Sequence, residues 1–286
     1  MPDQMPDQMP APTPAARLHD RYRGGGPGGE ATHAGTWSPI IDHLLQHRSV
    51  RAYLPGPLPP GTTETLVAAA QSAATSSNLQ TWSVVAVQDP ARKSRLAKLA
   101  SNQKHIEQAP LFLLWIADLS RATRLGIAHG RPLASVDYIE TFLIAVIDAA
   151  IASQNAIVAA ESLGLGTVYI GAIRNHPVEV AAEIGLPPGA MAVFGLCVGH
   201  PDPAHPAAVK PRLPQAAVLH HEQYGHAQEP AHIAAYDTHL QSFQIEQAMK
   251  PQGWSDLVLA RMAGLEGMTG RDKLRDALHA LGFPLR

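Results

Sequence analysis

The chain has 286 residues and a formal net charge of −2, with 45% hydrophobic and 16% charged residues. This is the composition of a globular protein long enough to bury a large core, and the near-neutral balance excludes a nucleic-acid binder that works through bulk positive charge. The single cysteine, Cys197, excludes an internal disulfide and a zinc site of the usual cysteine type. Its apolar context, "VFGLCVGH", predicts a small buried side chain in a strand.

The N-terminus repeats "MPDQ" and is rich in Pro and Gly, which predicts a disordered tail over residues 1–36. It has neither the basic nor the apolar segment of a signal peptide. The longest apolar stretch, residues 142–160, contains Asp148, Gln154 and Asn155, which favours a core helix over a membrane span. We therefore expect a cytoplasmic protein without a membrane partner.

After the tail, a capping Ser38, Pro39 and apolar residues at helical spacing predict a first helix over residues 38–49. Further along the chain, the hydrophobic pattern predicts helices over residues 62–74, 90–100, 138–163 and 176–187, and strands over residues 83–89, 111–118, 166–174 and 191–201. From about residue 225 the chain is polar and helical. There is no βαβ repeat and no GxGxxG motif, so we expect an α+β fold with few buried strands.

Two short basic motifs lie about 160 residues apart. Residues 47–51, "HRSVR", can be a helix end that complements the helix dipole, or an anion clamp built from forked Arg donors and a Ser hydroxyl. In "KPRLP", Pro211 stiffens the chain, so Lys210 and Arg212 point the same way, although a solvated linker also fits. Two rigid basic clusters in a nearly neutral chain favour one shared anion site, for which a phosphate monoester is the natural guest.

Two further motifs can line a ligand. Residues 75–82, "TSSNLQTW", offer donors and acceptors for a polyol or a heteroaromatic edge, or form a capped loop. Gly171, at the end of the predicted strand "GTVYIGAIR", permits a close approach of a ligand to the backbone, or serves as a turn glycine. The paired histidines of residues 219–221 lack a metal-ligand pattern, so no metal site is expected.

Together, these motifs resemble the oxygen-insensitive NADPH nitroreductase and flavin reductase branch of the nitroreductase superfamily. The resemblance rests on the order and spacing of "HRSVR", "TSSNLQ", "NQKHIEQAP", "AAESLGLGTVYIGAIRN", "FGLCVGHP" and "KPRLP", over about residues 37–224. It implies an FMN-binding domain over residues 37–286, with a mixed, largely antiparallel sheet wrapped by helices. It also implies an intertwined homodimer with exchanged C-terminal arms of about residues 225–286, and one FMN per subunit near the interface.

The resemblance also implies the residues that bind FMN. The FMN phosphate is expected to bind His47, Ser49, Lys210 and Arg212, with Arg48 in the same region. Arg51 is expected near the pyrimidine edge of the flavin. The flavin is expected to be lined by Thr75, Ser76, Ser77, Asn78 and Gln80. Gln103 is expected to bond the ribityl chain or the ring edge. The other side is expected to be formed by Tyr169, Ile170, Gly171 and Ala172, with the Gly171 N–H near flavin N5.

The implied activity is hydride transfer from NADPH or NADH through FMN to nitroaromatics, quinones or free flavin, with ping-pong kinetics. No catalytic acid or base is expected, since the cofactor carries the chemistry. Residues 225–253 contain one Lys or Arg, Lys250, where the family has a basic loop for the 2′-phosphate of NADPH, which leaves the choice of nicotinamide open. The alternatives are a flavin carrier or redox sensor that does not turn over, and a reductase specialised for another acceptor.

Overall fold

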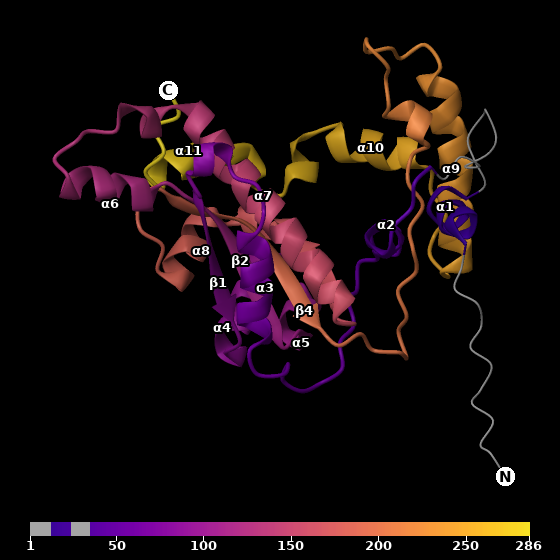
Figure 1. The fold of residues 1–286 in the computed structure, drawn as a ribbon, viewed down its shortest axis with the longest axis horizontal. Helices are drawn as coiled ribbons and strands as arrows, with labels where there is room; N and C mark the ends of the chain where they lie inside the picture. The colour runs from indigo at the N-terminus through magenta and orange to yellow at the C-terminus, as the bar shows by residue number, and fades with distance from the viewer. Residues whose placement is uncertain (1–12, 24–34) are drawn as a thin grey trace. The chain divides into compact units, whose positions relative to one another are not determined.

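The computed structural model of the protein describes residues 13–23 and 35–286 (Figure 1). The chain forms two compact units, each of which is described by itself. The helical unit consists of Met1–His47 and Ala208–Arg261, and the sheet unit consists of Arg48–Ala207 and Met262–Arg286.

The sheet unit is built on four antiparallel strands, β1 (Trp82–Val87), β2 (Leu111–Asp118), β3 (Gly166–Ile170) and β4 (Ala190–Gly199). Their order is β1-β2-β4-β3, so β2 and β4 are central while β1 and β3 lie at the edges. A parallel bridge between Ser49 and Thr167 extends the β3 edge. The predicted α+β class, with a largely antiparallel sheet, is confirmed.

Helices cover both faces of this sheet, because successive side chains of a strand point to opposite faces. Leu113 and Trp115 pack with residues of α3 and α7 on one face, and Phe112 and Leu114 pack with residues of α4, α5 and α8 on the other. The helices of the unit are α3 (Thr62–Gln71), α4 (Pro90–Leu99), α5 (Lys104–Gln108), α6 (Ser120–Ala128), α7 (Ile139–Ser162), α8 (Pro177–Ile184) and α11 (Leu274–Ala280).

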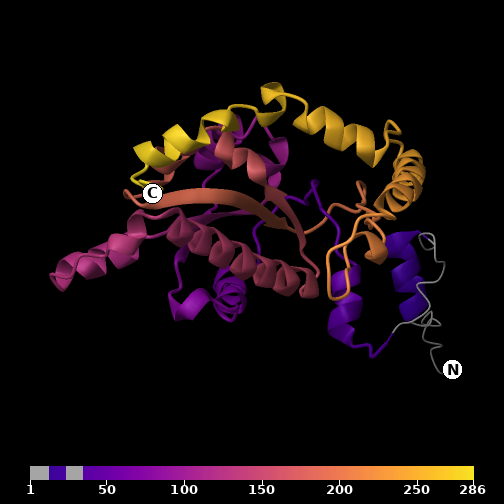
Figure 2. The same cartoon turned by 90° about the horizontal axis from the view of Figure 1, so that it is seen from above.

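Helix α7 has the length and composition of a membrane span, and among the described helices it is the one that does. Figure 2 shows it running along one face of the sheet, below the long strand β4. Asp148, near its middle, is 2% exposed, and Ala152, Ala156 and Ile157 join the core. This packing agrees with the predicted core helix.

Cys197 lies in β4, opposite Phe112 of β2, and is fully buried. Burial raises the pKa of its thiol. The prediction of a small buried side chain in a strand is confirmed.

The helical unit contains α1 (Pro14–Tyr22), α2 (Pro39–Leu45) and α9 (Glu229–Glu246), together with most of α10 (Trp254–Met262). Its core is formed by Tyr236, Leu240 and Phe243. Helix α1 differs from the tail predicted over residues 1–36. The Thr13 side chain caps this helix and Pro14 occupies its first turn, a start signal that the Pro- and Gly-rich composition obscured. Residues 1–12 and 24–34 of that predicted tail lie outside the described residues.

Most other predicted boundaries shift by a few residues. The first helix ends at Leu45, four residues earlier than predicted, because the chain turns to pair with β3 at Ser49. The strand β3 ends at Ile170, and a 3-10 turn follows over Gly171–Asn175. The segment 119–137, which the pattern left unassigned, contains α6 and a 3-10 turn over Ala134–Asp137.

We expect Gly195→Ala in β4 to destabilise the protein by about 1–3 kcal/mol, the usual result of overpacking a core. A Cβ atom at Gly195 would overlap the ring of Phe112. The free energy of unfolding by urea would measure the loss, with Gly35→Ala as a control because, among the described residues other than its chain neighbours, no atom lies within 4 Å of that Cβ position. In a double-mutant cycle, Phe112→Leu should recover part of the loss. Simple additivity of the two losses would contradict this packing.

Candidate functional site

The segment after His47 is fixed to the edge strand β3. The Val50 N–H donates to the Thr167 carbonyl at 2.8 Å, and the Tyr53 hydroxyl donates to the Val50 carbonyl at 2.7 Å. This approach needs a glycine at position 166, since a Cβ there would lie 2.7 Å from the Val50 Cβ. Val50 is 4% exposed, while the neighbouring residues Arg48 and Arg51 are exposed. The buried valine therefore anchors a segment whose cationic side chains remain accessible.

The end of β3 presents an accessible backbone. At Gly171, the only atoms within 4 Å of a Cβ position, among the described residues, are the Arg174 guanidinium nitrogens at 3.6 and 4.0 Å. Ile170 and Ala172 are buried, and Tyr169 shares a hydrogen bond of 2.7 Å with Ser153 of α7. Burial raises the pKa of Tyr169, and the Ser153 bond opposes this shift. A planar ligand can therefore reach the peptide of Gly171.

Two arginines lie near the Gly171 peptide. Arg174 donates to the Val193 carbonyl, and burial lowers the pKa of its guanidinium, with a further decrease from the charge of Arg271. Arg271 donates from Nε to the Asn175 side chain at 2.8 Å. The sequence analysis assigned no role to either residue. Arg174 lies within the quoted motif "GTVYIGAIR", but Arg271 is nearly 100 residues away and no motif points to it.

Arg51 lies near the segment around Gln103. Gln103 precedes α5, and burial lowers the pKa of His105 in that helix, with a further decrease from the charge of Arg51. The His105 Nε2 atom is buried and has no hydrogen-bond partner among the described residues. A buried polar atom of this kind is normally satisfied by a protein group or an ordered water.

The loop that contains Thr75 is organised by one buried carboxylate, Asp148 of α7. Asp148 accepts hydrogen bonds from the Thr75 hydroxyl at 2.6 Å, the Ser76 N–H at 3.1 Å, and the Thr81 hydroxyl and N–H at 3.1 and 3.3 Å. The sequence analysis used this residue only as an argument against a membrane span. A charge inside an apolar helix was the available signal, since such a group needs polar partners.

The same loop has strained backbone. Ser77, Asn78 and Gln80 have positive φ angles of 47°, 55° and 52°. Such angles are uncommon outside glycine and persist where the surrounding structure enforces them, often at ligand sites. Next to the loop is a cavity of about 630 Å³ whose lining includes Thr75, Asn78, Gln80, Trp82 and Arg121.

The predicted flavin-lining residues fall into two groups within the sheet unit. The loop 75–80 leads into β1, whereas residues 48–51 and 169–172 lie at β3, and the sheet order places these strands at opposite edges. Three strand spacings separate the edges by about 14 Å. The sheet unit of one chain therefore does not bring the two groups together.

The remaining predicted phosphate ligands belong to the helical unit. Lys210 and Arg212 are exposed on an extended segment, and the Tyr236 hydroxyl donates to the Pro211 carbonyl between them at 2.9 Å. Arg21 of α1 donates to the carbonyls of His47 and Lys210, both at 2.9 Å. The helical unit therefore draws the His47 and Lys210 backbones together. Arg21 was missed because it lies in the stretch that composition assigned to a tail.

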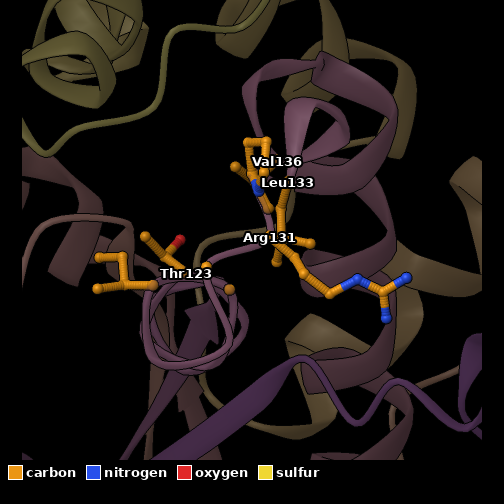
Figure 3. A pocket seen from close by; sticks show the side chains of 8 residues that line it. Thr123, Arg131, Leu133 and Val136 are labelled. Atoms are coloured by element: carbon orange, nitrogen blue, oxygen red, sulfur yellow. The ribbon is translucent and has the colours of Figure 1, made fainter.

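A second cavity, of about 320 Å³, lies between α6 and the turn that follows it, and none of the predicted flavin ligands lines it. Figure 3 shows Thr123 on one side of this cavity and the guanidinium of Arg131 pointing away from it.

Comparisons with known proteins point in one direction. The family described as the nitroreductase family matches residues 44–200, and the nitroreductase family C-terminal domain matches residues 210–286. The FMN reductase [NAD(P)H] of Bacillus subtilis is 40% identical over 223 residues, 77% of this chain and 89% of that protein. The oxygen-insensitive NADPH nitroreductase of Salmonella typhimurium is 38% identical, over 87% of this chain and all of that protein. The structure of NfrA2 from B. megaterium has a TM-score of 0.82 and 38% identity, covering 87% of this chain and 100% of that one.

We expect Asp148→Asn to destabilise the protein by about 1.5–3 kcal/mol, because it weakens several bonds to a charged acceptor. It should also speed proteolytic cleavage within residues 75–80. Urea unfolding and limited proteolysis would measure these effects, with Asp256→Asn on the exposed side of α10 as the control. An unchanged cleavage rate in the loop would show that Asp148 does not order it.

Proposed function

The chain belongs to the nitroreductase family, and on this premise we propose that it is an oxidoreductase that binds FMN and uses NADPH or NADH to reduce small oxidants such as nitroaromatics, quinones or free flavin. The observation that carries the proposal is the accessible Gly171 peptide at the end of β3, on the strand that holds the Arg48–Arg51 segment. The names of the relatives, an FMN reductase and an NADPH nitroreductase, support it.

The donors present fit FMN. Its phosphate is held by His47, Ser49, Lys210 and Arg212, with help from Arg48, because guanidinium, ammonium and hydroxyl groups are the usual phosphate donors. His105, two residues beyond Gln103, is half-buried and feels the charge of Arg51, which supports the placement of Gln103 and Arg51 beside one ligand.

When bound, FMN supplies the hydride chemistry, so the chain needs no acid or base of its own. The Gly171 N–H would orient the ring by donating a hydrogen bond to it, and Arg51 would supply a fixed positive charge near the pyrimidine edge. A charge that is already in place stabilises developing negative charge without reorganisation. The nicotinamide and the oxidant would use the same open site in turn, for which ping-pong kinetics are expected.

The functional assembly is a homodimer of this chain. On α7, Ile139, Leu143, Ile147 and Ile151 are 52%, 46%, 53% and 41% exposed. Residues four apart share one helix face, so these side chains form an apolar stripe of the kind that marks an interface. A second copy also explains the two separated groups of flavin-lining residues, because the loop 75–80 of one subunit then completes the site of the other. Of the expected C-terminal arm, residues 225–261 are the part that embraces the partner subunit, because residues 262–286 belong to the sheet unit of their own chain and contribute Leu278, Leu281 and Phe283 to its core. The dimer is cytoplasmic.

A flavin carrier or redox sensor that does not turn over is the second candidate. It is favoured by one observation, the single cation, Lys250, among residues 225–253, where a nicotinamide phosphate would need more. A reductase specialised for another acceptor shares the same site and differs only in the oxidant.

We expect the purified protein to be yellow, and to lose this colour when NADPH or NADH is added under argon. Adding a nitroaromatic or a quinone should restore the colour. Parallel anaerobic titrations followed at the flavin absorption band would measure both steps and rank the two nicotinamides. A yellow protein that neither nicotinamide bleaches would favour the carrier, and a protein that cannot take up FMN would contradict both candidates.

We expect Leu143→Asp with Ile147→Asp to convert the dimer to monomers, because two charges would be buried without partners at the interface. FMN affinity should fall in parallel as the loop 75–80 of the partner is lost. Sedimentation velocity and flavin titration would measure both, with Leu125→Asp, 60% exposed on α6, as the control. A wild-type monomer, or a double variant that stays dimeric, would contradict the proposed interface.

A further inference from the structure

We propose that Arg21, in the N-terminal helix α1, is a positioning residue for the FMN phosphate, because it holds the two phosphate-binding segments of the helical unit together. Arg21 is 5% exposed. Its guanidinium donates to the carbonyls of Leu45 at 2.6 Å, His47 at 2.9 Å and Lys210 at 2.9 Å. The inference rests on the proposed function, since it concerns the same FMN phosphate.

The planar guanidinium suits this task. It presents five N–H donors in a rigid fork and can bind several acceptors at fixed angles, whereas a lysine ammonium is a flexible point charge. Nη2 serves the two carbonyls at the end of α2, and Nη1 serves the carbonyl of Lys210. One side chain thus sets the distance between the His47 segment and the Lys210 segment.

A further hydrogen bond joins α1 and residues 210–212 in the opposite direction. The Arg212 N–H donates to the Arg21 carbonyl at 3.0 Å. The Lys210 carbonyl is bound by Arg21, and the Pro211 carbonyl is bound by Tyr236. Each of the residues 210–212 therefore has one backbone group fixed by a partner in the helical unit. The backbone that carries Lys210 and Arg212 is therefore held before any ligand arrives, which reduces the ordering cost of binding.

Helix α1 is itself fastened at both ends. Arg17 makes a two-pronged salt bridge with Asp42 of α2, at 2.8 and 3.3 Å. Arg23 pairs with Glu246 of α9 at 2.7 Å and lies over the ring of Phe243 at 5.6 Å. These contacts reach α2 and α9 and leave the contact with residues 210–212 to Arg21.

Arg21 lies outside the residues that match the nitroreductase family. The matched residues begin at 44, whereas α1 ends at Tyr22. Arg21 therefore brings into the phosphate site a segment that the family description does not contain.

The test compares FMN with riboflavin, which has the same ring and ribityl chain but no phosphate. Dissociation constants for both would be measured on the full-length protein, stripped of flavin, for the wild type, Arg21→Met, Arg21→Lys and Arg17→Ala. Arg17 is the matched control because it lies one turn earlier on α1 and binds Asp42. A variant with both Lys210→Ala and Arg212→Ala serves as the reference for loss of the phosphate donors.

We expect Arg21→Met to weaken FMN binding about tenfold while riboflavin binding stays unchanged, because misplaced charged donors bind the phosphate poorly. Arg21→Lys should keep the charge but lose the fork, and weaken FMN binding about threefold. Arg17→Ala should leave both constants unchanged. A merely structural role would lower both affinities together and leave their ratio at the wild-type value, which would overturn the proposal.

The outcomes remain distinguishable if a variant is unstable. Should Arg21→Met fail to fold, as circular dichroism would show, the FMN-to-riboflavin ratio of Arg21→Lys decides the question. A wild-type protein that binds no flavin would defeat the proposed function. A wild-type protein that binds FMN, with an unchanged ratio in both Arg21 variants, would defeat this inference alone. An unchanged ratio in the Lys210 and Arg212 variant would remove the phosphate assignment and this inference with it.

Discussion

The close pairing of Val50 with Thr167 is the constraint on which the candidate site depends. One backbone hydrogen bond of 2.8 Å holds the segment 48–51 to the edge of β3, and it is possible because residue 166 has no side chain. The pairing puts the accessible cations of that segment beside β3, which ends just before Gly171. The predicted phosphate donors in residues 48–49 and the predicted ring contact at Gly171 are thereby linked through β3, to which the buried Val50 is hydrogen-bonded.

Two buried charged side chains order segments of the candidate site in the same way. Asp148 accepts bonds from the loop 75–81, and Arg21 donates to the carbonyls of Leu45, His47 and Lys210. In each case a charged side chain from a helix binds groups of an irregular segment that has no ladder of its own. Charge-assisted hydrogen bonds are stronger than neutral ones, so a single residue suffices to order several peptides. The conformation of the candidate site is thus set largely by residues that the motifs do not contain.

The sequence predicted the existence of most elements but not their arrangement. The four strands were found because apolar runs are bounded by turn residues, as around Leu111–Asp118. Their order could not be found, since pairing across the sheet joins residues far apart in the chain. For the same reason, the motifs named the lining residues without showing that Thr75 and Gly171 belong to opposite edges. Helix α1 was missed because the Pro- and Gly-rich composition outweighed the capping signal of Thr13. The role of Asp148 was missed because the sequence of an apolar helix does not show which distant groups its one charged residue binds.

The burial of Cys197 has a consequence for the proposed reduction of quinones and nitroaromatics. Quinones and the nitroso products of nitroaromatic reduction are electrophiles, and the thiolate is the form of cysteine that attacks them. Near the C-terminal end of β4, in the packed core, the only thiol of the chain is kept both protonated and out of reach. The folded protein therefore offers no thiolate to such electrophiles, and would not be alkylated at cysteine by them.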